Sequence, residues 1–160
     1  MADFDLSESY DSETWVVMYS DASGYPDQFL KFCIQKIEDA DLPNVDYGIV
    51  DMTSGGWFSK ETTPMAYVRF QKSALEKMGI WFRAQRFGNL VVFSMYKCIK
   101  KGFFDAVTGK TKAEVLAGIR ASMTSNLAEI EEFDCLDLFG GLIFRQAKNN
   151  FDNEDEKNLS

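Results

Sequence analysis

The pattern of apolar residues in the first half of the chain predicts a strand, a helix and two further strands. Residues 13–20 are rich in β-branched and aromatic side chains, which is typical of a strand. Pro26 and Asp27 fit the first turn of a helix, and apolar residues then recur at helical spacing, which predicts a helix over 26–40. Short apolar runs at 46–52 and 65–71 predict the next two strands.

Residues 80–99 predict a β-hairpin, because two strand-like runs flank Gly88-Asn89, a dipeptide that suits a two-residue turn. This turn would place Phe87 opposite Leu90 and Trp81 opposite Tyr96. Since side chains alternate between the faces of a sheet, one face would carry the apolar residues expected in the core, which are Ile80, Phe82, Ala84, Val91, Phe93 and Met95. The other face would carry Trp81, Arg83, Gln85, Val92, Ser94 and Tyr96.

The second half predicts a helix over 112–131 and a last strand around 136–145, interrupted by Gly140-Gly141. The resulting order, β-α-β-β-β-β-α-β, predicts an α+β fold: an antiparallel or mixed sheet of about five to six strands with two helices packed on it. We expect one domain over residues 14–147, with acidic flexible tails at 1–13 and 148–160.

Composition favours a globular intracellular protein. The chain has 160 residues, of which 46% are hydrophobic and 14% aromatic. It contains no apolar run of membrane-spanning length and no signal-like start, so we expect a cytoplasmic protein that does not bind membranes. Its three cysteines are widely spaced, which argues against disulfides and cysteine zinc sites. The chain has no histidine, which removes the commonest general base and metal ligand, so we lean against an enzyme and expect neither cofactor nor metal.

The net charge of −8 hides a strong segregation along the sequence. Residues 1–30 carry seven acids and no base, whereas residues 60–120 carry twelve bases and four acids. Such asymmetry indicates either a dipolar binding surface or acidic tails that fold back over a basic middle. Composition does not distinguish between these two arrangements.

Aromatic and basic residues gather on the ambiguous face of the predicted sheet. If the strand at 65–71 pairs alongside the hairpin, this face would combine Tyr67, Arg69, Trp81, Arg83 and Tyr96, with Lys97, Lys100 and Lys101 at its edge. Three alternatives stay open: a face covered by a helix, a protein-binding face, or a platform on which nucleic-acid bases stack. Trp57 and Phe58, in a glycine-rich loop, are further candidate partner-binding residues.

Two partial motifs do not fix an activity. Gly109-Lys110-Thr111 resembles the end of a phosphate-binding loop, but the required earlier glycine is missing. Lys101-Gly102-Phe103 matches only the first positions of an RNA-recognition motif.

The sequence therefore favours a small acidic protein-binding module that acts by occupying a partner's surface, as an inhibitor, immunity protein, chaperone or viral antagonist does. One alternative is a single-stranded nucleic-acid binder that uses the basic middle segment. Another is a small-ligand-binding protein or an enzyme with a pocket between sheet and helices. The identity of the partner and the oligomeric state stay open.

Overall fold

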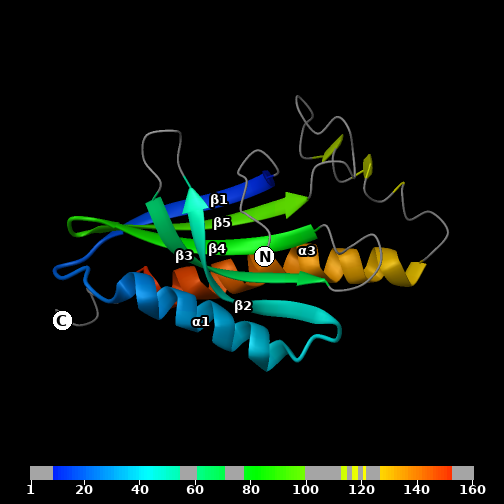
Figure 1. Cartoon of the computed structure of the whole chain (residues 1–160), viewed down its shortest axis with the longest axis horizontal. Helices are drawn as coiled ribbons and strands as arrows, with labels where there is room; N and C mark the ends of the chain where they lie inside the picture. The colour runs from blue at the N-terminus through cyan, green and yellow to red at the C-terminus, as the bar shows by residue number, and fades with distance from the viewer. Residues whose placement is uncertain are drawn as a thin grey trace.

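The protein has an α+β fold, and in the part of the chain that the structure describes, helices α1 and α3 lie on one face of a five-stranded antiparallel sheet (Figure 1). The computed structural model describes residues 9–54, 61–70, 78–99, 113–114, 117–118, 121 and 127–152. The expected fold class is confirmed. The described elements follow in the order β1 (Ser9–Met18), α1 (Tyr25–Ala40), β2 (Val45–Ser54), β3 (Glu61–Phe70), β4 (Met78–Phe87), β5 (Leu90–Ile99) and α3 (Leu127–Phe151).

The sheet has the strand order β1-β5-β4-β3-β2, so β1 and β2 lie at opposite edges. Strands β2 to β5 form a meander, and β1 closes the sheet by pairing antiparallel with β5. The predicted hairpin register is confirmed, with Phe87 opposite Leu90 and Trp81 opposite Tyr96. Gly88 adopts φ 61°, a left-handed conformation that a two-residue hairpin turn requires and that glycine reaches without steric cost.

Helix α1 connects β1 with β2 across one face of the sheet and begins where the sequence predicts, with Pro26 in its first turn. Helix α3 packs beside α1 on the same face. Between helices and sheet lies an aromatic core, in which Trp15 stacks on Phe93 with ring centroids 4.5 Å apart. The Tyr19 hydroxyl donates a 2.7 Å hydrogen bond to the Phe151 carbonyl, which ties the end of α3 to the residue after β1.

The structure corrects the prediction in the C-terminal region. Residues 136–145, expected to form a strand, lie inside α3. Residues 113–114, 117–118 and 121 of the helix expected at 112–131 are helical, and residues 127–131 belong to α3. Residues 9–13 and 148–151, expected in the acidic tails, belong to β1 and α3 instead. Residues 1–8 and 153–160 of the expected tails lie outside the described part of the chain, as do both partial motifs.

Candidate protein-binding surfaces

The predicted aromatic and arginine residues share one sheet face, the face opposite the helices. Cross-strand pairing places Trp81 between Tyr67 on β3 and Tyr96 on β5. However, Tyr67 and Trp81 are only 7% and 6% exposed, and their ring centroids lie 5.1 Å apart. With Met52, Met65 and Cys98 they form a second buried cluster, to which neither α1 nor α3 contributes. These two rings therefore do not form an open stacking platform.

The two arginines of this face have different partners. Arg69 forms an ion pair with Asp46, with Nη2 and Oδ2 2.9 Å apart, and the Tyr67 hydroxyl donates to the same carboxylate at 3.3 Å. Burial and the negative charge of Asp46 raise the pKa of Tyr67 above its ordinary value. Arg83 donates hydrogen bonds to the Gln85 and Thr63 side chains and has no acidic partner among the described residues. The charge of Arg69 is thus matched by Asp46, whereas no described acid matches that of Arg83.

Lys97 does not lie at the edge of this face. It pairs with Ile80 in the sheet and points toward the helices, where it is only 5% exposed. Its ammonium group lies 3.2 Å from Asp137 of α3 and 3.7 Å from Asp11 of β1, and the Tyr10 hydroxyl donates to Asp137 at 3.0 Å. This network stabilises the packing of α3 on the sheet and offers no contact to an external phosphate.

The side-chain alternation along β5 could have shown this position for Lys97, because Val91, Phe93 and Met95 precede it at odd numbers on the core face. The other four predicted binding residues, Trp57, Phe58, Lys100 and Lys101, lie outside the described residues.

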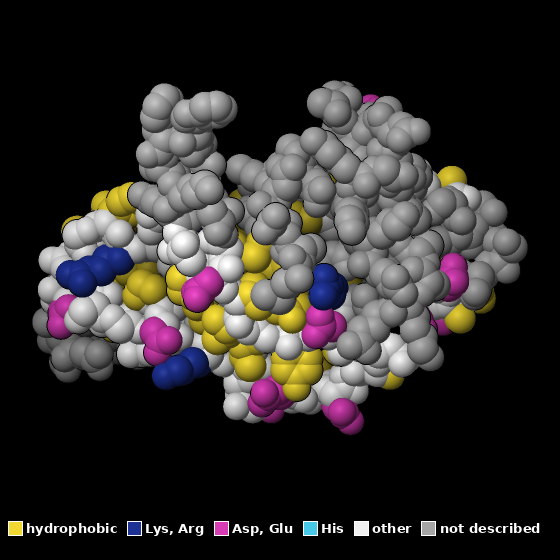
Figure 2. Space-filling model, in the orientation of Figure 1, with side chains coloured by type: hydrophobic (Ala, Val, Ile, Leu, Met, Phe, Trp, Pro, Cys, Tyr) yellow, Lys and Arg dark blue, Asp and Glu magenta, His cyan; other side chains and the backbone are white. Residues whose placement is uncertain are grey.

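A patch of exposed apolar side chains, which we name the apolar sheet end, was not predicted. It consists of Val16, Met18, Phe87 and Leu90, which are 52%, 74%, 54% and 42% exposed. Met18 pairs with Leu90, Leu90 pairs with Phe87, and Val16 lies two residues before Met18, so all four share the face opposite the helices. Hydrophobic side chains are visible at this end of the molecule, to the left in Figure 2.

A backbone hydrogen bond holds the end of β1 against the hairpin turn between β4 and β5. The Tyr19 amide donates this bond to the Asn89 carbonyl over 2.8 Å. Single exposed apolar residues are common on soluble proteins, but a contiguous patch across three strands is typical of an interaction site. The hairpin register predicted from the sequence already placed Phe87 beside Leu90. It could not place Val16 and Met18 next to them, because this depends on the pairing of β1 with β5, which are distant in sequence.

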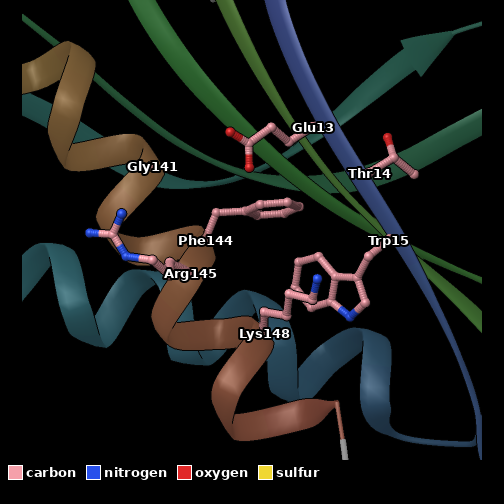
Figure 3. A pocket seen from close by; sticks show the side chains of 7 residues that line it. All are labelled: Glu13, Thr14, Trp15, Gly141, Phe144, Arg145 and Lys148. Carbon is pink, nitrogen blue, oxygen red and sulfur yellow. The ribbon is translucent and has the colours of Figure 1, made fainter.

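A groove separates the edge strand β1 from α3 (Figure 3). Its volume is about 480 Å³, and it is lined by Glu13, Thr14, Trp15, Gly141, Phe144, Arg145 and Lys148. The rings of Trp15 and Phe144 meet edge to face with centroids 4.4 Å apart. Glu13 extends from the strand, and Arg145 and Lys148 extend from the helix. None of these three charged residues forms an ion pair with a described residue.

Among the described residues, no group of three or more histidine, cysteine, aspartate or glutamate side chains is arranged to hold a metal ion. Within the same part of the chain, no helix has both the length and the apolar character that crossing a bilayer requires. The comparisons with protein-family models, with curated proteins and with solved structures find no match to this chain.

Proposed function

We propose that this chain is a protein-binding module that acts by occupying the surface of a partner protein, and that the apolar sheet end is its main contact. The observation that carries the proposal is the contiguous exposure of Val16, Met18, Phe87 and Leu90 on three neighbouring strands. Large apolar patches on soluble domains are typical of surfaces that another protein covers.

The residue types in the patch suit a protein interface. Phenylalanine and methionine are enriched in interfaces, and full burial of one such side chain contributes about 1.5–3 kcal/mol. The patch lies on paired strands, so binding requires little ordering of the backbone. A net charge of −8 favours a partner with a basic rim around its apolar surface, and such complementarity gives fast association that salt weakens.

A capture experiment with three forms of the full chain tests this proposal. The wild type, a Met18→Ser/Phe87→Ser variant and an Ile49→Ser control are immobilised, incubated with a host extract at low salt, and eluted with urea, because urea weakens apolar contacts and salt does not. Ile49 is 46% exposed on β2, comparable with the 54% exposure of Phe87, but it lies at the edge of the sheet opposite β1. We expect a stoichiometric protein to elute from the wild type and the control, and to be lost from the double variant.

Two results would contradict the proposal. Equal capture by all three forms would show that the apolar sheet end is not the contact. Elution of nucleic acid that survives removal of bound protein, read from the absorbance ratio at 260 and 280 nm, would favour the nucleic-acid alternative. Arg83 would then be the first residue to substitute, because it is the arginine of the aromatic face without a described acidic partner.

A further inference from the structure

The outward side of α3 carries two exposed leucines among charged residues at heptad spacing. Residues on this side follow one another at intervals of four and three, in the order Leu127, Glu131, Asp134, Leu138, Gly141, Arg145 and Lys148. This spacing is the one that lets two helices pack along a common seam. Leu127 and Leu138 are 70% and 71% exposed, whereas the leucine of the opposite helix side, Leu136, is fully buried.

The charges of this seam change sign at its middle. Glu131 and Asp134 precede Leu138, and Arg145 and Lys148 follow Gly141. Asp134 lies four residues before Leu138, and Arg145 lies four residues after Gly141. Likewise, Glu131 lies seven residues before Leu138, and Lys148 lies seven residues after Gly141. The seam is therefore complementary to itself when a second identical helix runs antiparallel to it.

We propose that two copies of this chain associate through α3, antiparallel, with Leu138 of each copy seated at Gly141 of the other. In this register Asp134 faces the second copy's Arg145, and Glu131 faces the second copy's Lys148. The two-fold axis repeats each contact, which gives four ion pairs around two leucines. A parallel arrangement would instead place each charge opposite an identical charge, so the charge pattern selects the antiparallel one.

The groove beside α3 provides the space that the second copy's leucine needs. Apart from its chain neighbours and the nearby backbone of α3, a Cβ atom on Gly141 meets no atom within 4 Å, so the helix has a notch at this position. Gly141 also lines the groove of about 480 Å³, together with Trp15, Phe144 and the two basic residues of the seam. A leucine at the notch would therefore contact the aromatic side chains of the groove, and the flanking acids would face Arg145 and Lys148.

Sedimentation velocity of the full chain between about 5 and 500 µM tests the proposal directly, because a reversible dimer forms by mass action. One helix seam is small compared with a standard protein interface, so we expect a dissociation constant in the micromolar range. Leu138→Ser should raise this constant at least about tenfold, because it removes the central apolar contact. Ile49→Ser, at an exposed apolar position of β2 outside both proposed surfaces, should leave it unchanged.

A charge exchange tests the register. Arg145→Glu places like charges opposite Asp134 on both sides of the two-fold axis and should weaken the dimer about tenfold. Adding Asp134→Arg to the same chain should restore affinity to within about threefold of the wild type, because both pairs are again complementary. Gly141→Leu provides a second route, since the position has room for an added Cβ atom and the leucine side chain would occupy the notch. This variant should remain folded by circular dichroism and lose the dimer.

The proposal would be overturned by a chain that stays monomeric over the whole concentration range. The interface would lie elsewhere if Leu138→Ser left the dissociation constant of the dimer unchanged. The same conclusion would follow if adding Asp134→Arg to Arg145→Glu failed to restore affinity. A small molecule retained by the monomer in native mass spectra and displaced by Gly141→Leu would assign the groove to a ligand instead. None of these results depends on partner capture by the apolar sheet end, so the two proposals fail independently.

Discussion

At the scale of single residues, Gly140 and Gly141 have opposite surroundings although they are neighbours in α3. A Cβ atom on Gly140 would lie 2.6 Å from Ile80 Cδ1, 3.1 Å from Ile80 Cγ2 and 3.3 Å from Met95 Sδ. Ile80 and Met95 are fully buried and have little room to move. A Cβ atom on Gly141 would meet nothing. Gly140 therefore permits the close approach of helix and sheet, whereas Gly141 serves no packing role within the chain.

This contrast predicts opposite effects for two alanine substitutions. Gly141→Ala should raise the free energy of unfolding by about 0.5–1 kcal/mol, because alanine loses less backbone freedom in a helix. Gly140→Ala gains the same amount but overpacks the core at a cost of about 1–3 kcal/mol, so it should be net destabilising. Urea unfolding at about 1 µM, where the chain is expected to be monomeric, measures both changes. Equal stabilisation by both alanines would show that the contact with Ile80 relaxes freely.

At the scale of secondary-structure elements, the sequence predicted correctly those features that depend on residues close together in the chain. The hairpin register followed from Gly88-Asn89, because a two-residue turn sets the pairing of both strands that it joins. The strand at 136–145 was wrong because Gly140-Gly141, within an apolar run, favours strand or turn over helix when read locally. The apolar residues of this region recur at helical spacing, and this periodicity is stronger evidence than the two glycines. The residues that α3 buries at this spacing are Phe133, Leu136, Ile143, Phe144, Ala147 and Phe151.

The candidate surfaces were less predictable than the elements because they depend on contacts between distant segments. The aromatic and arginine face was placed correctly by alternation, but the burial of Tyr67 and Trp81 depends on tertiary packing. The apolar sheet end depends on the pairing of β1 with β5, about 75 residues apart in sequence. Arg69 was a candidate contact, and its pairing with Asp46 required the register of β2 with β3.

The buried network of Lys97 connects three elements and predicts a large loss of stability. Lys97→Ala would leave the carboxylates of Asp11 and Asp137 without the cation that lies between them. Loss of one partner from a buried ion pair costs about 3–5 kcal/mol. As a control, Lys31→Ala removes an exposed ion pair with Asp27 and should change the free energy of unfolding by less than about 0.5 kcal/mol. Similar losses in both variants, measured by urea unfolding, would contradict a stabilising role for the network.

At the scale of the whole molecule, the stability of the fold should decrease in alkaline solution. Burial, together with the negative charge of Asp137, raises the pKa of Tyr10, and burial raises the pKa of Tyr67 and of the Cys33 thiol. The unfolded chain releases these protons from about pH 8.5 for cysteine and about pH 10 for tyrosine, whereas the folded chain retains them. Over this range the folded state binds more protons, so the free energy of unfolding falls as pH rises.

Urea unfolding between about pH 7 and pH 11 measures this slope, which amounts to at most about 1.4 kcal/mol per pH unit for each retained proton. Tyr10→Phe removes one ionisable group from the buried network and should make the decline above about pH 10 less steep, even though it also removes the hydrogen bond to Asp137. Tyr47→Phe, at a 39% exposed position of β2, serves as the control for loss of a phenol hydroxyl. Parallel declines in all three proteins would mean that Tyr10 ionises as readily in the folded state as in the unfolded state. In that case the contact between Tyr10 and α3 would have to open without unfolding of the sheet.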